Sequence, residues 1–267
     1  MTTALADELV ALAARLATEA GRIARDGRAA HGVAAASTKS SATDVVTEFD
    51  KASEAFIVAG ILAARPDDGI VGEEGTDRPS TSGVVWVIDP IDGTTNFLYG
   101  LAGWAVSIAA RLHGQPLAAA VALPATDELF TATKGGGAWC NGRPVRCGIT
   151  SDLALALVGT GFSYHAERRR VQAERVAALL PQVRDVRRFG AAAADLCYVA
   201  DGRLDVYFEH GLNDWDLAAG ELIAAEAGCE LSSIDGGPIH AASVLVANPA
   251  LRRPMQDLLA RCEPAGC

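Results

Sequence analysis

Apolar residues recur at helical spacing at the start of the chain and fall along a single stripe. The stripe consists of Leu5, Leu9, Leu12, Leu16 and Ile23. Residues spaced in this way lie on one face of a helix, so the pattern predicts an N-terminal amphipathic helix. Gly27 and Gly32 are expected to mark its end.

A small and polar stretch over residues 34–43 follows and is expected to form a loop. A second helix is expected to begin in the 44–50 region and to run through Phe56 and Leu62. It should stop before Pro66, because a proline disfavours helical backbone in the residue that precedes it.

The periodicity changes at residues 84–88, which are continuously apolar and rich in β-branched side chains. Such a run is typical of a strand that is covered on both faces. Further strand-like runs occupy about 104–111, 117–123 and 128–133. The Asn-Gly pair at 141–142 is a strong signal for a tight turn.

Strands and helices alternate in the second part of the chain. The expected order is strand 155–159, helix 165–180, helix 190–200, strand 204–209, helix 216–228, strand 243–247 and a final helix. This alternation favours a layered fold of the α+β or α/β class, a sandwich of sheets and helices, over one doubly wound sheet. We expect a division near residue 148. The N-terminal α+β half (1–148) would carry most candidate metal ligands, and the C-terminal α/β half (149–267) would carry Asp216 and substrate contacts.

The charge balance argues against a nucleic-acid-binding protein, which normally presents a basic face. The formal net charge is −10 and the calculated pI is about 5.0. An acidic enzyme that acts on anionic substrates must supply positive charge from a bound metal ion or from helix N-termini.

The chain is expected to be cytoplasmic. Its start has no basic segment before an apolar one, and no stretch is apolar over the roughly 18 residues that a membrane span needs. The six cysteines form no C-x-x-C pair and are expected to be thiols in a reducing compartment.

The candidate chemistry begins where the apolar strand ends, at Asp89. Pro90 should stop the strand's ladder of hydrogen bonds, and Asp92 follows at once. Two carboxylates so close at a strand end can converge on one point, where they would repel each other. A hard divalent cation removes that cost. The backbone N–H groups of residues 93–95 would then point outward as a phosphate cradle.

Each of these signals also has an ordinary structural interpretation. The Asp-Gly pair at 92–93 can be a plain turn, and the Glu73-Glu74 pair between glycines can be a solvated turn. Asp216 lies where an apolar helix begins, so on its own it would be an N-cap.

Taken together, these segments resemble the inositol monophosphatase family, from about residue 39 to residue 248 and with a similar N-terminal helix. The motifs are Gly-Glu-Glu at 72–74, Asp-Pro-Ile-Asp-Gly-Thr-Thr-Asn-Phe at 89–97, Trp-Asp-x-Ala-Ala-Gly at 215–220 and Lys-Ser-Ser-x-x-Asp-x-Val-Thr-x-x-Asp at 39–50. The resemblance implies an αβαβα sandwich of alternating helix and sheet layers. It also implies a magnesium-dependent, lithium-sensitive phosphatase that forms a homodimer.

The resemblance further implies which residues hold two or three Mg²⁺ ions. Glu73, Asp89 and the carbonyl group of Ile91 would bind one ion. Asp89, Asp92 and Asp216 would bind a second, and a weaker third site would lie near Glu73. Paired ions of this kind stabilise the charge that develops when water displaces an alcohol from phosphorus.

Catalytic and substrate-binding roles follow from the same resemblance. In the family, the residues that match Glu73 and Thr94 orient the attacking water, and Asp50 matches the carboxylate that holds this threonine. The implied substrate contacts are Asp92, Gly93, Thr94, Thr95, Ala192 (or its neighbour Ala191), Glu209 and Asp216. Carboxylates accept hydrogen bonds from vicinal hydroxyls, so inositol monophosphate is the expected substrate.

Two other functions stay open at this point. A related phosphatase could act on histidinol phosphate, fructose 1,6-bisphosphate, a nucleotide 3′-phosphate or the 2′-phosphate of NADP. A non-catalytic regulatory protein could keep the fold and bind a protein partner.

Other features receive minor or no roles. The five histidines are expected at the surface or in packing, and Trp104 and Trp139 in the core. Arg187 and Arg188 either face solvent, lie at a dimer interface or rim the active site. Asp214 receives no role.

Overall fold

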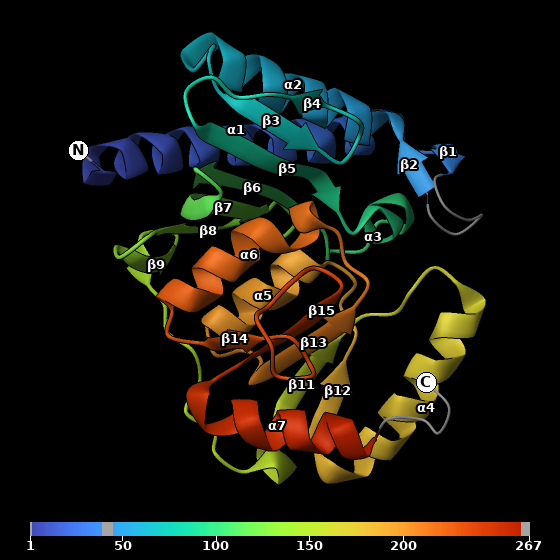
Figure 1. Cartoon of the computed structure of the whole chain (residues 1–267). Coiled ribbons are helices and arrows are strands. Elements are labelled where there is room, and N and C mark those ends of the chain that lie inside the picture. Colours follow the sequence, from blue (N-terminus) through green and yellow to red (C-terminus); the bar gives the residue numbers. More distant parts are fainter. Residues whose placement is uncertain (1, 39–44, 263–267) are drawn as a thin grey trace.

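Helices and sheets alternate along the molecule in the computed structural model, which describes residues 2–38 and 45–262 (Figure 1). Helices α1 and α2 form one outer layer, and an 8-stranded sheet lies beneath them. Helices α5 and α6 separate this sheet from a 5-stranded sheet, whose other side carries α7 and α4. The predicted αβαβα sandwich is therefore confirmed.

The outer layer consists of α1 (Thr2–His31) and α2 (Glu48–Ala64), which bury their apolar faces on the large sheet. Gly27 does not end α1 as expected, because the helix continues to His31. A Cβ atom at Gly27 would lie 2.6 Å from the Phe49 ring, so the glycine allows close packing there.

The predicted loop at 34–43 is also partly wrong. A short strand β1 (Ala35–Thr38) pairs with β2 (Val45–Thr47) just before α2. Residues 39–44, which begin the Lys-Ser-Ser motif, lie outside the described residues.

The large sheet carries two of the candidate metal ligands, Asp89 and Asp92, at the C-terminal end of its strand β5. Its strands are β3 (Gly69–Gly72), β4 (Asp77–Arg78), β5 (Val84–Asp92), β6 (Ala105–Leu112), β7 (Gln115–Leu123), β8 (Glu128–Thr133), β9 (Gly137–Cys140) and β10 (Arg143–Pro144), in the order β10-β9-β8-β7-β6-β5-β3-β4. Pro90 does not end β5 as expected. The strand passes it with a shift in register between Asp89 and Asp92 and leads directly into α3 (Thr94–Tyr99).

The second sheet contains both parallel and antiparallel pairs. Its strands are β11 (Leu157–Thr160), β12 (Asp185–Arg187), β13 (Val206–His210), β14 (Glu230–Ser232) and β15 (Ser243–Ala247), in the order β12-β11-β13-β15-β14. The remaining helices are α4 (Ala166–Leu179), α5 (Ala192–Ala200), α6 (Asp214–Glu226), α7 (Pro249–Arg261) and the short 3₁₀ turns Leu153–Leu155 and Leu180–Gln182.

Helices α5 and α6 are rich in small residues because they pack between two sheets. Ala218 and Ala219 of α6 lie in a cluster with residues of the large sheet, whereas Leu217 packs with residues of the second sheet. A Cβ atom at Gly220 would lie 2.5 Å from Leu196, so this glycine lets α6 approach α5 closely.

The division of the chain into two halves near residue 148 stays a proposal.

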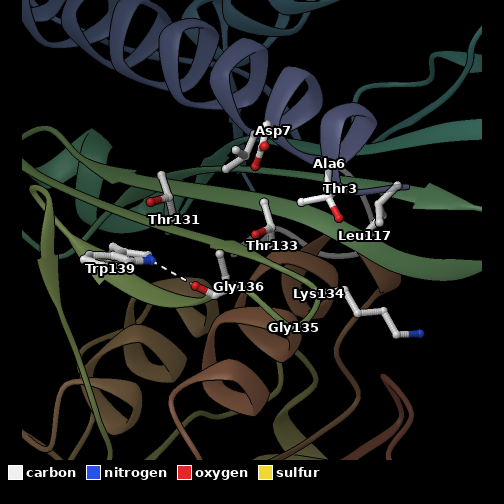
Figure 2. Close-up of a pocket in the computed structure, with 12 residues that line it drawn as sticks. Thr3, Ala6, Asp7, Leu117, Thr131, Thr133, Lys134, Gly135, Gly136 and Trp139 are labelled. Atoms are coloured by element: carbon white, nitrogen blue, oxygen red, sulfur yellow. Dashed lines mark hydrogen bonds between the residues drawn. The ribbon is translucent and has the colours of Figure 1, made fainter. Parts of the chain in front are cut away.

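The two tryptophans predicted in the core differ in burial. Trp104 is 4% exposed, but Trp139 is 40% exposed, so the prediction for Trp139 is wrong. Trp139 lies on β9 near the edge of the sheet, and its indole N–H donates to the Gly136 carbonyl group at 3.3 Å. There it lines an open pocket of about 410 Å³ beside the start of α1 (Figure 2).

Within the described residues, no helix combines the length and the apolarity that crossing a membrane requires.

Candidate active site

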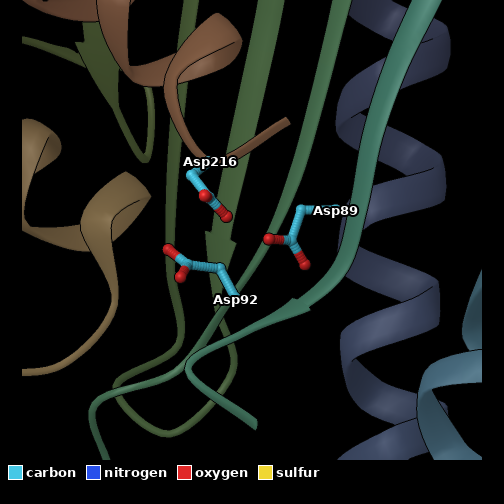
Figure 3. A group of neighbouring side chains, drawn as sticks. All are labelled: Asp89, Asp92 and Asp216. Atoms are coloured by element: carbon cyan, nitrogen blue, oxygen red, sulfur yellow. The ribbon is translucent and has the colours of Figure 1, made fainter. Parts of the chain in front are cut away.

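Three carboxylates from distant parts of the sequence meet between the two sheets. Asp89 and Asp92 come from the end of β5, and Asp216 comes from the first turn of α6 (Figure 3). One oxygen atom from each lies within 4.8 Å of the others. Asp89 and Asp92 are 1% and 7% exposed, and Asp216 is partly exposed.

Backbone amides hold each of these carboxylates in place. The Ile91 N–H donates to Asp89 Oδ1 at 3.0 Å, and the Ala193 N–H at the start of α5 donates to Asp92 Oδ2 at 2.7 Å. Asp216 is not the N-cap of α6, as its local sequence suggested. The N-cap is Asn213, whose N–H donates to Asp216 Oδ2 at 2.7 Å in a capping box. Asp216 thus stabilises the helix and also faces the cluster.

The electrostatics of the cluster favour a cation. Burial, followed by the charges of Glu73, Asp92 and Asp216, raises the pKa of Asp89 well above its ordinary value. Burial and then the charge of Asp216 raise the pKa of Asp92 in the same way. Glu73, just beyond β3, also shares a hydrogen bond with Asp89. A concentrated set of hard oxygen donors with unbalanced negative charge fits a divalent cation such as Mg²⁺.

A threonine and an aspartate, Thr94 and Asp50, lie beside the carboxylates. The Thr94 hydroxyl is 3.0 Å from Asp50 Oδ1 and 3.0 Å from the Ile91 carbonyl oxygen. Asp50 also accepts a hydrogen bond from the Thr47 N–H at 2.8 Å, in the capping box of α2. Burial raises the pKa of Asp50 to about 6, against the opposing effect of these hydrogen bonds.

A pocket of about 470 Å³ opens from the carboxylates towards the second sheet. The predicted site residues that line it are Glu73, Asp89, Ile91, Asp92, Gly93, Thr94, Ala192, Glu209 and Asp216, together with Ala191. Two predicted residues do not line it. Asp50 reaches the site only through Thr94, and Thr95 is not among the lining residues.

Glu209 is held in the pocket by two residues that the sequence analysis missed. The Tyr207 hydroxyl donates a hydrogen bond to Glu209, and a Cβ atom at Gly161 would lie 1.9 Å from Glu209 Oε2. Burial raises the pKa of Glu209 to about 7, against the opposing effect of the Tyr207 hydrogen bond. Tyr207 and Glu209 are two residues apart on one strand, so their side chains lie on the same face of the sheet. The sequence already contained this signal.

Cationic side chains also line the pocket. Arg168 and Arg188 line it together with His165 and His210, which sequence reasoning had set aside. Arg188 therefore fits the hypothesis of a pocket-rim residue. Arg187 does not line the pocket, and it pairs with Asp185 at 2.6 Å.

Asp214, which had no expected role, forms a two-pronged ion pair with Arg111 of β6. The distances are 2.5 Å from Arg111 Nη1 and 2.7 Å from Nη2. The pair fastens the first residue of α6 to the large sheet, two positions before Asp216.

Comparison with known proteins assigns the chain to a family. The model of the inositol monophosphatase family matches residues 5–263. The inositol-1-monophosphatase of Mycobacterium leprae is 44% identical over 259 residues, which cover 90% of this chain and 89% of that protein. The Nus factor SuhB of Salmonella typhimurium is 40% identical over 251 residues, which cover 92% and 94%.

A solved structure agrees with this assignment. The extragenic suppressor protein suhB from Bartonella henselae superposes with a TM-score of 0.89 at 32% identity, over 97% of this chain and 100% of that one. The fold and the acidic pocket are thus those of a phosphoric monoester hydrolase. The chain belongs to the inositol monophosphatase family.

Proposed function

We propose that this enzyme hydrolyses inositol monophosphate to inositol and phosphate and that it depends on Mg²⁺. The observation that carries the proposal is the meeting of Asp89, Asp92 and Asp216 within 4.8 Å, in a pocket that Glu209 also lines. The name of the Mycobacterium leprae relative supports the same substrate.

Two or three ions would be held by Glu73, Asp89, the Ile91 carbonyl group, Asp92 and Asp216. Carboxylate and carbonyl oxygens are the ligands that Mg²⁺ prefers. Bound there, Mg²⁺ would stabilise the negative charge on the phosphoryl oxygens and would lower the pKa of the attacking water.

The residues of the chain position the reactants. Glu73 and the Thr94 hydroxyl would orient the water, while Asp50 holds Thr94 through the hydrogen bond at 3.0 Å. The N–H groups of residues 93–95 would face the phosphate at the start of α3. Positioning is a large part of the protein's contribution to phosphoryl transfer, because the protein itself forms no covalent bond to phosphorus.

The substrate alcohol would lie towards the second sheet. Glu209, Asp92 and Asp216 would accept hydrogen bonds from its hydroxyls, and the backbone at Ala192 would lie against its ring. Glu209 contributes most when ionised, since a carboxylate accepts stronger hydrogen bonds than a carboxylic acid.

Phosphate release from a panel of esters, with and without Mg²⁺, tests the proposal. We expect the highest kcat/KM on inositol monophosphate, activity only with Mg²⁺, and loss of activity in the Asp89→Asn variant. A dominant rate on a non-polyol ester would overturn the substrate, and unchanged activity in Asp89→Asn would overturn the metal site.

A second candidate substrate is fructose 1,6-bisphosphate, and one observation favours it. Arg168 and Arg188 line the pocket and can attract a second phosphate group. The same panel decides between the two substrates. Histidinol phosphate, a nucleotide 3′-phosphate and the 2′-phosphate of NADP belong in the panel as the remaining esters.

A regulatory role alongside catalysis is favoured by the name of the Salmonella relative, Nus factor SuhB. A protein partner that still binds the inactive Asp89→Asn variant would separate this role from hydrolysis.

We also propose a cytoplasmic homodimer that millimolar lithium inhibits. Light scattering that gave a monomer mass, or activity insensitive to high lithium, would contradict these two points.

A further inference from the structure

A pair of cysteines lies at the far end of α6, away from the carboxylates. Cys147 follows β10 and is partly exposed, whereas Cys229 lies just beyond α6 and is buried. Their thiols share a hydrogen bond. We propose that Cys147 and Cys229 form a reversible dithiol–disulfide site, in which Cys147 reacts with an external oxidant and Cys229 closes the bond.

The backbone holds the two cysteines side by side. The Cys147 N–H donates to the Ala227 carbonyl group at 3.1 Å, which ties the segment after β10 to the turn that follows α6. A Cβ atom at Gly228 would lie 4.0 Å from Cys147 Sγ, so this turn itself borders the Cys147 sulfur. Both cysteines pack on the same apolar cluster. With the chain already aligned, small side-chain rotations can bring the sulfurs to bonding distance.

The two thiols differ in the way that such chemistry requires. The hydrogen bond with Cys229, helped by a backbone amide and by Arg146, lowers the pKa of Cys147 to about 7 despite partial burial. The same hydrogen bond, together with burial, raises the pKa of Cys229. At neutral pH the thiolate therefore forms on the accessible sulfur, which is the one that an oxidant can reach.

Other cysteines provide an internal contrast. Cys140 and Cys197 are both buried, and burial raises the pKa of each thiol. Cys262 is buried as well, and burial again raises its pKa. These three lack the exposed thiolate that Cys147 provides.

The proposed reaction uses a peroxide as the oxidant. The Cys147 thiolate attacks one oxygen atom of hydrogen peroxide, the O–O bond breaks, and the released hydroxide takes up a proton to leave as water. Cys229 then attacks the sulfur of the Cys147 sulfenic acid. The S–O bond breaks, and the departing hydroxide takes the Cys229 proton and leaves as a second water. The protein loses two electrons, which reduce the peroxide. A small thiol reductant restores both cysteines through thiol–disulfide exchange.

The test treats the full-length protein with hydrogen peroxide, traps remaining thiols with N-ethylmaleimide after denaturation, and analyses the peptides by mass spectrometry. We expect one cross-linked species that joins the Cys147 and Cys229 peptides, lighter by two hydrogens, and its disappearance after reduction. Recovery of both cysteines as maleimide adducts would overturn the proposal. Irreversible oxidation of Cys147 without a cross-link would also overturn it.

Three variants sharpen the result. In Cys229→Ser the Cys147 sulfenic acid should persist and be trapped by dimedone, and in Cys147→Ser the buried Cys229 should stay unmodified. The matched control Cys262→Ser removes a buried cysteine elsewhere and should leave the cross-link yield unchanged. A cross-link in Cys147→Ser that joins Cys229 to another cysteine would contradict the assigned roles.

Discussion

A glycine at position 161 decides where the Glu209 carboxylate can lie. The residue lines the pocket, and any side chain there would meet the Glu209 carboxylate. Tyr207 holds the same carboxylate from within the strand. One residue thus leaves space and another supplies a bond, and together they determine how Glu209 faces a substrate.

We expect Gly161→Ala to raise KM for inositol monophosphate about tenfold, with a smaller effect on kcat. The added Cβ atom would lie 1.9 Å from Glu209 Oε2, so the carboxylate must move and lose a hydrogen bond to the substrate. A hydrogen bond to a charged group contributes roughly 1.5 kcal/mol, which corresponds to this factor. Steady-state kinetics at saturating Mg²⁺ measure it.

The Glu209→Ala background provides the control. There Gly161→Ala should have no further effect, because the displaced carboxylate is already absent. An equal loss in both backgrounds would mean that the glycine matters for the backbone and not for Glu209.

The reactivity of Cys147 should depend on pH with a midpoint near its pKa of about 7. The thiolate is the nucleophile, so alkylation by iodoacetamide should rise about tenfold per pH unit below the midpoint and level off above it. In Cys229→Ala the midpoint should move upward, because the hydrogen bond that lowers the pKa of Cys147 is lost. A midpoint near the ordinary value of a free thiol in the unsubstituted protein would contradict this.

At the scale of elements, the start of α6 is an anchor for the carboxylate cluster. The helix carries Asp216 in its first turn, and the Arg111–Asp214 pair ties that turn to β6. Asn213 and Asp216 also close the capping box. Small movements of this helix end would move Asp216 relative to Asp89 and Asp92 on β5.

We expect Arg111→Ala to weaken activation by Mg²⁺ by about threefold to fivefold, because α6 loses its tie to β6. A partly exposed ion pair contributes up to about 1 kcal/mol, which limits the effect. The concentration of Mg²⁺ for half-maximal activity is the measurement.

Arg252→Ala is the matched control for this prediction. It removes the Arg252–Glu230 ion pair, which has a distance of 2.9 Å and joins α7 to β14 without contact to the site. Equal effects of the two variants on Mg²⁺ activation would show that the Arg111 pair acts only through general stability.

At the scale of the whole molecule, the metal site exists only in the folded chain. Asp89 and Asp92 belong to the large sheet, and Asp216 belongs to a helix between the two sheets. An ion that binds the folded state alone stabilises it by mass action. Mg²⁺ at about 100 times its dissociation constant should therefore add roughly 2.7 kcal/mol to the free energy of unfolding.

Whether the Asp89→Asn variant is more or less stable than the unsubstituted protein should depend on the metal. In EDTA it should unfold at a higher temperature than the unsubstituted protein, because it removes one of several buried charges that repel each other. In Mg²⁺ it should unfold at a lower temperature, because it binds the ion poorly. Thermal unfolding by circular dichroism in both buffers tests this. The same rank in both buffers would contradict a metal site at Asp89.

Much of the fold could be predicted from local pattern. The N-terminal helix follows from apolar residues at helical spacing, and the strand that begins at Val84 follows from a continuous apolar run, because burial of one face or of both leaves these patterns in the sequence. The alternation of strands and helices predicts a layered fold, whereas the αβαβα order is what the family resemblance implies. The short strands β3, β12 and β14 escaped prediction. So few residues carry too little pattern, and pairing with neighbouring strands decides their structure.

The sequence by itself determined the family, the layered class and the carboxylates to examine, since each motif is a run of neighbouring residues with its own chemistry. The tertiary structure alone decided which distant groups touch. It joined Asp216 to β5, placed Gly161 against Glu209, exposed Trp139 and brought Cys147 to Cys229. The reason is physical, because these contacts depend on how helices and sheets pack, and packing is a property of surfaces built from many separate segments.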